Sequence, residues 1–261
     1  MQISLQNKKA LVGGATSGLG KAIAMQLAVC GASVTLMSRS EEKLKNVLTE
    51  LPANNHQKHS YLVVDFTDYN AFKNNIKNYF ADNTIDILVN NTNGPKAGGA
   101  LDKTTTDYQD AFDLLFKTVH HTTQLALPHM QQQGFGRIIN LTSRTVQEPA
   151  DNLALSNTIR SGITAWAKTL ASAVGKHNIT VNNILTGNFD TERLQSLFTG
   201  QAEQSGKTYE EIKQKAAEEI AVKRIGKPEE MGYLVTFLAS EFADYITGTN
   251  ITIDGGLMKS L

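Results

Sequence analysis

The sequence predicts an α/β fold in which a doubly wound, seven-stranded parallel sheet carries helices on both faces. Short, nearly continuous apolar runs rich in β-branched residues and leucine recur along the chain, as expected of strands buried on both faces. Segments with helical periodicity fall between these runs, and such alternation implies right-handed crossovers between parallel strands. The length of 261 residues allows one domain with a sizeable core.

The elements follow one another without a repeat, a low-complexity segment or an interdomain linker, so residues 1–261 are expected to form a single domain of Rossmann type. Each expected strand is an apolar run, and the seven are Lys9–Val12, Ala32–Met37 (ASVTLM), Tyr61–Val64 (YLVV), Ile85–Val89 (IDILV), Arg137–Leu141 (RIINL), Ile179–Ile184 (ITVNNI) and Asn250–Ile253. The expected helices are the periodic segments between them, at about Gly20–Cys30, Glu41–Leu51, Tyr69–Phe80, Tyr108–Gln132, Asn152–Val174 and Pro228–Phe242.

One long excursion separates the sixth expected strand from the last expected helix. Residues 190–227 contain helical patterns at Thr191–Phe198 and Tyr209–Ala221. An insertion after the carboxyl end of a strand is placed to fold over a cleft as a lid. A surface helical hairpin that serves only packing is the alternative. The apolar residues that a lid would offer to a substrate are Phe189, Leu194 and Phe198.

Composition excludes several classes of function. Lys plus Arg and Asp plus Glu number 25 each, so the net charge is zero and no basic surface for nucleic acid or an acidic membrane is expected. Cys30 is the only cysteine, which excludes an internal disulfide and a cysteine-based metal cluster, and we expect it to pack as a small hydrophobe. No spacing of histidines and acids indicates a metal site. No stretch suits a membrane span or a secretory signal, so a soluble cytoplasmic protein is expected.

The segment Leu11–Gly20 reads LVGGATSGLG and forms a glycine-rich turn between the first expected strand and helix. Glycines lack a Cβ, so the backbone there can bend sharply and approach a pyrophosphate closely. The free N–H groups at the start of the following helix then face the anion. The turn therefore predicts a phosphate-bearing dinucleotide, and its expected contacts are Gly14, Thr16, Ser17, Gly18, Leu19 and Gly20.

The residue that follows the second expected strand indicates which dinucleotide binds. An acid there would accept hydrogen bonds from both ribose hydroxyls and favour NAD. The chain has Arg39 instead, whose planar guanidinium can hold a 2′-phosphate with two hydrogen bonds. NADP(H) is therefore preferred over NAD(H). The alternative is a solvated arginine that pairs with Glu41 or Glu42.

Three further segments complete the expected cofactor site. Asp65 and Phe66 follow the third strand, where they would cap the adenine amino group. Asparagine-rich backbone after the fourth strand would pass under the cofactor, and its side chains can tie neighbouring strands together. For Thr92 and Asn93 a purely structural turn is the alternative. The remaining expected contacts are Asn91 and Gly187.

Together these features resemble the short-chain dehydrogenase/reductase family, and in particular 3-oxoacyl-acyl-carrier-protein reductases, over essentially the whole chain. The segments that carry the resemblance are Gly13–Gly20 for the TGxxxGxG motif, with glycine in place of the leading threonine, Asn90–Asn93 for NNAG, Gly136–Ser143 (GRIINLTS), Arg224–Glu230 and Ile253–Gly256. The resemblance implies a carbonyl or alcohol substrate. It also implies a homodimer or homotetramer that assembles through Tyr108–Gln132 and Asn152–Val174.

The family's catalytic pattern is only partly present. The resemblance implies a serine that orients the substrate carbonyl, a tyrosine that acts as general acid/base, a lysine, and an asparagine on the preceding long helix. Ser143 matches the serine, but Ser156 stands at the tyrosine position, Arg160 at the lysine position and Leu115 at the asparagine position. LSNxxR thus replaces YxxxK, as in a divergent subgroup of the family.

These replacements have chemical consequences. A serine hydroxyl at position 156 stops several ångströms short of a tyrosine phenol, so it cannot be the usual acid without an intervening water. Arg160 lies one helical turn away on the same face and can hold the nicotinamide ribose, but it is too basic to exchange protons at neutral pH. We expect Ser143, Ser156 and Arg160 to form the catalytic site, with Ser156 contacting substrate or a relay water.

Other side chains are poor substitutes for the missing groups. Tyr209 would have to swing in from the lid, and Lys168 lies too deep along the helix that carries Arg160. His120 and His121 are typical of core or helix-surface histidines.

Three functions stay open. The first is an NADP(H)-dependent oxidoreductase with a non-standard proton donor. The second is an inactive dinucleotide-binding pseudoenzyme or interaction module. The third is an elimination or hydration enzyme that uses Glu148 or Asp151 as base, although both acids also suit loop or helix-capping roles.

Overall fold

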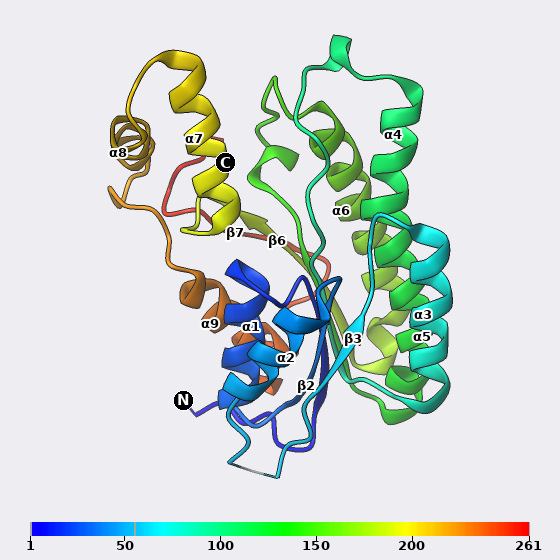
Figure 1. The fold of residues 1–261 in the computed structure, drawn as a ribbon. Coiled ribbons are helices and arrows are strands. Elements are labelled where there is room, and N and C mark those ends of the chain that lie inside the picture. Colours follow the sequence, from blue (N-terminus) through cyan, green and yellow to red (C-terminus); the bar gives the residue numbers. More distant parts are fainter. Residues whose placement is uncertain (1, 55, 261) are drawn as a thin grey trace.

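In the computed structural model, which describes residues 2–54 and 56–260, seven parallel strands form one sheet with helices on both faces (Figure 1). Met1, Asn55 and Leu261, which belong to the expected domain 1–261, lie outside the described residues. The strand order β3-β2-β1-β4-β5-β6-β7 reverses the winding between β1 and β4. This is a doubly wound arrangement, so the predicted fold class is confirmed.

The strands begin and end within two residues of the expected bounds. They are β1 Lys9–Gly13, β2 Ser33–Ser38, β3 Ser60–Val63, β4 Ile87–Asn90, β5 Gly136–Leu141, β6 Ile179–Thr186 and β7 Asn250–Ile253. β4 and β5 are buried at every position, as the apolar runs predict for strands covered on both faces.

The helices divide into two layers, each with its own hydrophobic core (Figure 1). One layer contains α1 Gly18–Val29, α2 Glu41–Glu50 and α9 Pro228–Ala239. The other contains α3 Tyr69–Asp82, α4 Thr105–Phe112, α5 Thr118–Gln133 and α6 Ala154–Val174. Cys30 is partly buried against the first core, which confirms its expected packing role. The expected extension of the last helix to Phe242 is wrong, because α9 ends at Ala239 and a separate 3₁₀ turn follows.

The long helix expected at Tyr108–Gln132 is interrupted. A π-helical turn, Asp113–Lys117, separates α4 from α5. The Thr118 hydroxyl donates to the Leu114 carbonyl at 2.5 Å and so competes with the backbone for this acceptor. Hydrophobic periodicity does not resolve a single wide turn, which explains why the sequence predicts a continuous helix. The interruption places Leu115, the residue at the family's asparagine position, inside the π turn.

The excursion at residues 190–227 forms two helices, α7 Glu192–Ser205 and α8 Tyr209–Glu219. α7 extends well beyond the expected Phe198, and it is capped by Gly206, whose φ of 68° suits glycine. The two ends of the excursion meet: Asp190 N donates to Gly226 O, and Gly226 N donates to Asn188 O, both at 2.9 Å. We call residues 190–227 the lid, after the role that their place in the sequence predicts.

Two of the three apolar residues expected to meet a substrate are used in packing instead. Phe189 is 5% exposed and pairs with Gly226 at the base of the lid. Phe198 is equally buried and packs against the Tyr209 ring, with 6.3 Å between centroids. Leu194 is half-buried and is the one of the three that these contacts leave available.

A ladder of asparagine side chains ties β4 to β7. Asn90, Asn140, Asn183 and Asn250 occupy paired positions on adjacent strands. Each amide Nδ2 donates to the next Oδ1, at 2.8, 2.9 and 2.9 Å. The expectation that asparagines after the fourth strand tie strands together is thus confirmed for Asn90. These bonds satisfy buried amides and fix the carboxyl halves of the four strands relative to one another.

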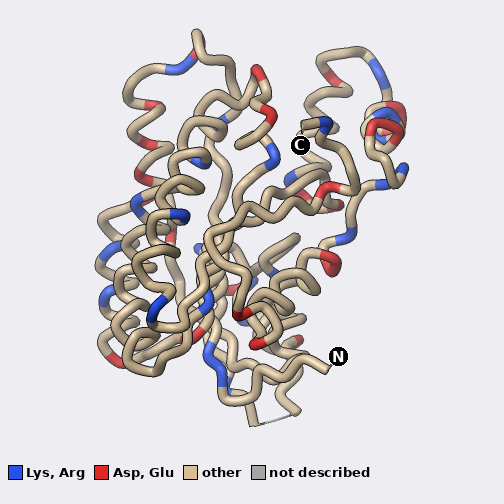
Figure 2. The backbone as a smooth tube through the Cα atoms, turned by 180° about the vertical axis from the view of Figure 1, so that it is seen from behind, with Lys and Arg blue, Asp and Glu red and all other residues tan. Residues whose placement is uncertain are grey.

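Charge and apolar surface follow the composition. Figure 2 shows basic and acidic residues interspersed along the helices, in keeping with a net charge of zero. Within residues 2–54 and 56–260, no helix combines the length and the apolar character that a bilayer span requires.

Candidate active site

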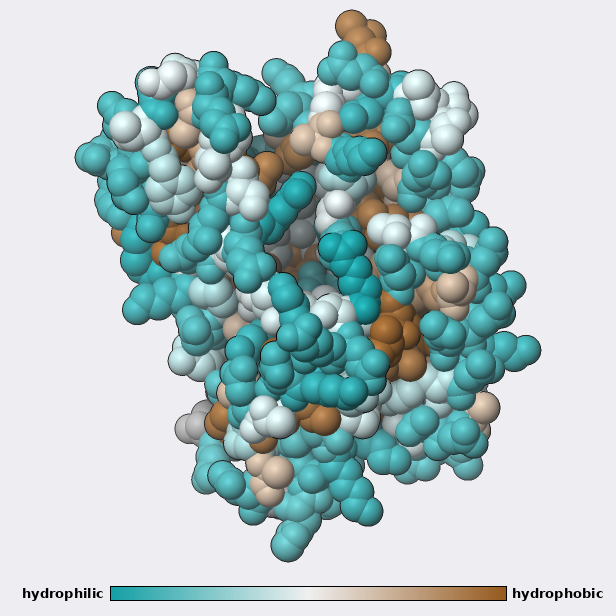
Figure 3. Space-filling view, in the orientation of Figure 1, coloured by the Kyte–Doolittle hydropathy of each residue, from teal (hydrophilic) through white to brown (hydrophobic). Residues whose placement is uncertain are grey.

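The molecule is hollowed between the lid and the layer that contains α4 and α6 (Figure 3). The carboxyl ends of β1 and β4, where the winding reverses, lead to this hollow, and such a switch point is where open α/β sheets bind ligands. The glycine-rich turn follows β1, and the segment Asn91–Gly94 follows β4. We call the space between these two segments the groove.

The glycines of the turn are required by its geometry. Gly14 and Gly18 have φ values of 57° and 51°, which side chains rarely adopt. A Cβ on Gly20 would lie 2.1 Å from the Gly14 carbonyl oxygen, and one on Gly13 would lie 2.3 Å from the Asn91 carbonyl oxygen. The Asn91 side chain also donates to Gly13 O at 3.0 Å. The turn is therefore compact and is held directly against the segment after β4.

The amino end of α1 is open to an anion. Ser17 occupies the N-cap position but makes no capping hydrogen bond, and no acid lies in the first turn. The first N–H groups of a helix have no partner within the helix, so here they are available to a ligand. Thr16 is held in place through its hydroxyl, 3.2 Å from that of Ser38 at the end of β2. These features fit the pyrophosphate of a dinucleotide.

Arg39 is exposed and makes no ion pair with any described residue. Glu41, one of the two acids named in the alternative, pairs with Lys45 at 2.9 Å and accepts from the Tyr61 hydroxyl. Glu42 makes no bond to it either. Arg39 thus makes no ion pair with Glu41 or Glu42, its charge acts on the nearby Asp65, and its exposure suits both a solvated arginine and a phosphate contact.

The two residues expected at the adenine differ in their environment. Thr67 donates to the Asp65 carboxylate through its backbone N–H at 2.9 Å and its hydroxyl at 2.7 Å. These bonds hold the pKa of Asp65 below its usual range and fix its orientation. Phe66 is buried and its ring packs at 5.4 Å from that of Phe72, so the ring belongs to the core.

A cavity of about 720 Å³ opens beside α3 and α4 and is lined by Gly94, Pro95 and Lys96 of the segment after β4. Its charged lining consists of Asp68, Lys96, Asp107, Asp110, Asp113 and Lys117. Carboxylates outnumber the lysines, and they repel a dinucleotide that carries phosphates. The glycine turn is therefore the better candidate for cofactor binding.

The three expected catalytic residues converge at the end of β5. Ser143 follows β5 and accepts hydrogen bonds from Thr145 N at 3.2 Å and Thr145 Oγ1 at 3.0 Å. Arg160 Nε donates to Ser156 Oγ at 3.2 Å, and its Nη1 donates to the Leu141 carbonyl at 2.8 Å. Because Leu141 is the last residue of β5, this second bond ties α6 to the strand that leads into Ser143.

The guanidinium of Arg160 has only neutral partners among the described residues. Burial lowers its pKa to about 10, so it remains a cation at neutral pH. It can donate hydrogen bonds and supply positive charge, but it does not release a proton at neutral pH.

Four other positions weighed from the sequence play packing roles. Leu115 is 1% exposed, within the second core, and has no polar group to hold a water. Tyr209 packs on Phe198 inside the lid. His120 stacks on Phe116, and the Lys168 stem lies against Gly248, before β7. None of these four provides an acid beside Ser156.

Glu148 is a loop anchor. Its Oε1 accepts hydrogen bonds from the backbone N–H groups of Lys259 and Ser260, both at 2.6 Å. These bonds hold its pKa below the usual range, so the carboxylate is ionised and occupied. Asp151 is exposed. The contact between the loop after Ser143 and the carboxyl-terminal segment has no signal in the sequence, because it joins residues 111 positions apart.

The lid contributes residues that the sequence analysis did not assign to the site. A Cβ on Gly18 would lie 3.0 Å from Thr191 Cγ2, so the start of α7 packs on the glycine turn. A Cβ on Gly94 would lie 3.9 Å from Arg193 Nη2. Gly187, an expected cofactor contact, leaves no room for a side chain, since a Cβ would lie 2.5 Å from Asp254 Cα. Arg193 lies two residues beyond Thr191, the cap of α7, and the sequence offers no other signal that this arginine belongs to the site.

Comparison with known proteins gives consistent matches. The family model described as enoyl-(acyl carrier protein) reductase matches residues 14–258. The chain is 34% identical over 264 residues to 3-oxoacyl-[acyl-carrier-protein] reductase FabG of Aquifex aeolicus (strain VF5), with 98% of this chain and 100% of the relative covered. It is 31% identical over 266 residues to the NADPH-dependent reductase BacG of Bacillus subtilis (strain 168), with 98% and 100% covered. The structure of L-sorbose reductase from Gluconobacter frateurii complexed with NADPH and L-sorbose matches with a TM-score of 0.92 and 27% identity over 100% of both chains.

Proposed function

The chain belongs to the short-chain dehydrogenase/reductase family, and from this we propose that it is an NADP(H)-dependent oxidoreductase acting on a carbonyl or alcohol substrate. Residues 1–261 would form one Rossmann-type domain, with the lid over its groove. The observation that carries it is the glycine turn with the uncapped amino end of α1, a site suited to a pyrophosphate. Named relatives are NADPH-dependent or were solved with NADPH, which supports the choice of cofactor.

In the proposed site each residue has a defined task. Bound NADPH would supply the hydride. The Ser143 hydroxyl, fixed by Thr145, would donate to the substrate carbonyl oxygen and orient it. Arg160 would donate to the nicotinamide ribose and stabilise negative charge that develops on the substrate oxygen. Ser156 would hold a water as the proton donor, because its hydroxyl is too short to reach the substrate as a phenol does. The remaining cofactor contacts are proposed as Gly14, Thr16, Ser17, Gly18, Leu19, Gly20, Arg39, Asp65, Phe66, Asn91, Thr92, Asn93 and Gly187.

A second function is favoured by Leu115 and Ser156. A buried leucine replaces the polar anchor of a relay water, and no phenol lies on α6. Both changes suit a protein that binds the dinucleotide without redox chemistry. The two functions share the cofactor site and differ in turnover. A binding measurement therefore tests whether the chain holds the dinucleotide, and NADPH consumption tests whether it performs redox chemistry.

Arg39 is expected to make NADPH bind more tightly than NADH. Charge-assisted hydrogen bonds to the 2′-phosphate contribute about 1.5–3 kcal/mol, which corresponds to about 10- to 100-fold in affinity. Fluorescence titration of the purified protein with each cofactor measures this difference directly. The Arg39→Ala variant is expected to lose most of the NADPH affinity and to keep that for NADH. Equal affinities of the wild type for NADPH and NADH would show that Arg39 does not bind the 2′-phosphate. If the folded protein binds neither cofactor, the proposed oxidoreductase function is wrong.

We further propose a homodimer, as a unit on its own or within a tetramer, that assembles through α4, α5 and α6. The rings of Phe112, Phe116 and His120 stack in a row, with centroid distances of 5.0 and 5.9 Å, and Trp166 of α6 meets Phe116 edge-on at 5.8 Å. Phe112 at the end of this row is 37% exposed, and a second copy would cover it.

The Phe112→Lys variant is expected to dissociate this dimer, because a partner would have to bury the new charge. Sedimentation velocity measures the change. The fully exposed Tyr245, replaced by lysine, is the control and is expected to sediment like the wild type. A monomeric wild type would contradict the proposed dimer, and a dimeric Phe112→Lys variant would exclude this surface as its interface.

A further inference from the structure

The first turn of α7 is fixed relative to the sheet. Thr191 caps the helix by accepting from Leu194 N at 3.3 Å. The residues just before it are bonded to Gly226, and Gly187 N donates to Ile253 O of β7 at 3.0 Å. A side chain in the first turn of α7 therefore starts from an anchored backbone, although the lid is an insertion.

The first turn of α7 reaches both walls of the groove. Thr191 packs on Gly18, which follows β1, and the guanidinium of Arg193 lies next to Gly94, which follows β4. These two strands are the pair between which the winding reverses. The first turn of α7 therefore places Arg193 beside the groove, near the segment after β4.

Arg193 has no hydrogen bond or ion pair with any described residue. Of the nearby acids, Asp190 accepts from Gln195 Nε2 at 3.1 Å, and Glu192 is exposed on the same helix. Arg193 is exposed, so its charge is not neutralised by a carboxylate of the fold. Its five N–H donors are free for an anion that enters the groove.

We propose that Arg193 binds the pyrophosphate of the dinucleotide from the lid side, opposite the N–H groups of α1. This inference rests on the proposed function and adds a residue outside the expected cofactor contacts. The guanidinium fork matches two phosphate oxygens, and the anchored first turn of α7 presents it to the groove from the lid side. Arg39 would bind the 2′-phosphate, and Arg193 the pyrophosphate.

Calorimetric titrations with three ligands distinguish the contribution of Arg39 from that of Arg193. Adenosine 2′-monophosphate has the 2′-phosphate only, 2′-phospho-ADP-ribose adds the pyrophosphate, and NADPH adds the nicotinamide. The Arg193→Gln variant is expected to bind 2′-phospho-ADP-ribose and NADPH about tenfold or more weakly than the wild type, which is the effect of one charge-assisted hydrogen bond. Its affinity for adenosine 2′-monophosphate is expected to stay within about twofold of the wild-type value. Arg193→Lys, which keeps the charge and loses the fork, is expected to fall between. Lys215→Gln makes the same charge change on an exposed part of the lid and is expected to bind all three like the wild type.

Each other result overturns the inference. Unchanged binding of NADPH by Arg193→Gln would show that the side chain does not contact the cofactor. Equal weakening of all three ligands, or the same weakening in Lys215→Gln, would indicate a long-range charge effect. Failure of the wild type to bind NADPH would refute the proposed function together with this inference, whereas tight wild-type binding with an unaffected variant refutes the inference alone.

Discussion

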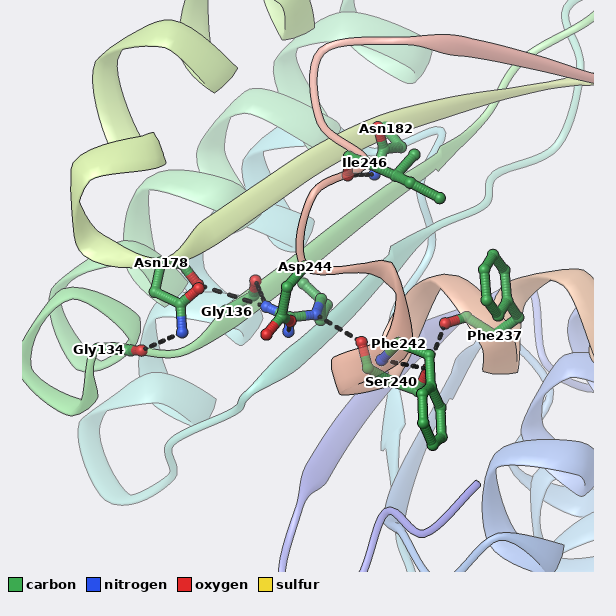
Figure 4. Close-up of polar contacts among 10 residues, drawn as sticks. Gly134, Gly136, Asn178, Asn182, Phe237, Ser240, Phe242, Asp244 and Ile246 are labelled. Atoms are coloured by element: carbon green, nitrogen blue, oxygen red, sulfur yellow. Dashed lines mark hydrogen bonds and ion pairs between the residues drawn. The ribbon is translucent and has the colours of Figure 1, made fainter. Parts of the chain in front are cut away.

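Replacement of Arg137 by alanine is expected to lower the free energy of unfolding by about 3–5 kcal/mol, since it opens a cavity and leaves several carbonyls without a donor. Arg137 lies on β5 and is completely buried. Its guanidinium bonds to Asp244, Ser240 O, Gly136 O and Asn178 O, and Figure 4 labels these four partners. It thereby joins β5 to the turn after α9 and to the start of β6.

The expected loss in the free energy of unfolding follows from the burial of the Arg137 cation. Burial lowers the pKa of Arg137, which means that the site disfavours a charge in the absence of these partners. Its face also lies 4.1 Å from the centroid of the Phe135 ring. Asp244 is 48% exposed, so water screens its half of the ion pair. The neutral carbonyl bonds are therefore expected to carry more of the stability than the ion pair.

Urea unfolding at one protein concentration tests this ranking, because an oligomer's stability depends on concentration. Asp244→Asn keeps an acceptor and removes the charge, and it is expected to cost only about 1 kcal/mol. A loss below about 1 kcal/mol for Arg137→Ala would contradict the role assigned to the carbonyl bonds. A larger loss in Asp244→Asn than in Arg137→Ala would assign the stability to the ion pair instead.

The sheet was predictable because its signal is local. A strand buried on both faces is a run of apolar residues, and the glycine turn after β1 is specified by contacts that only glycine allows. The candidate catalytic residues Ser156 and Arg160 were also predictable as neighbours, since residues one helical turn apart share a face. Each of these inferences needs only one segment of the chain.

Contacts between distant segments were not predictable. Glu148 meets the carboxyl-terminal backbone, and Arg193 meets Gly94, only because the fold brings their loops together. Sequence spacing therefore suggested Glu148 as a base, whereas its two backbone donors assign it to the loop. The interruption at Asp113–Lys117 was missed for another reason, since one π turn changes the helical phase too little to alter the apolar pattern.

Restoring a phenol to α6 is expected to produce the largest gain in turnover. A positioned general acid contributes about 10²–10⁴-fold, and the proposed site lacks one because Ser156 cannot reach the substrate oxygen. In the double variant Ser156→Tyr, Arg160→Lys, the phenol occupies the groove and the ammonium group lowers its pKa. NADPH oxidation with acetoacetyl-CoA, a 3-oxoacyl substrate, is expected to rise by about 10²-fold or more over the wild type.

The matched control is Ser156→Phe, Arg160→Lys, which fills the same volume without a hydroxyl. If proton donation limits the reaction, this variant stays at or below the wild-type rate, and the tyrosine variant also acquires a pH dependence from its phenol. Equal rates for the two variants would mean that ring size, rather than proton transfer, sets turnover. No gain in a tyrosine variant that still binds NADPH would place the defect elsewhere, at Leu115 or in the path of the substrate, and would favour the dinucleotide-binding protein without redox activity. The experiment thus separates a site that lacks only its acid from one that has lost the geometry for hydride transfer.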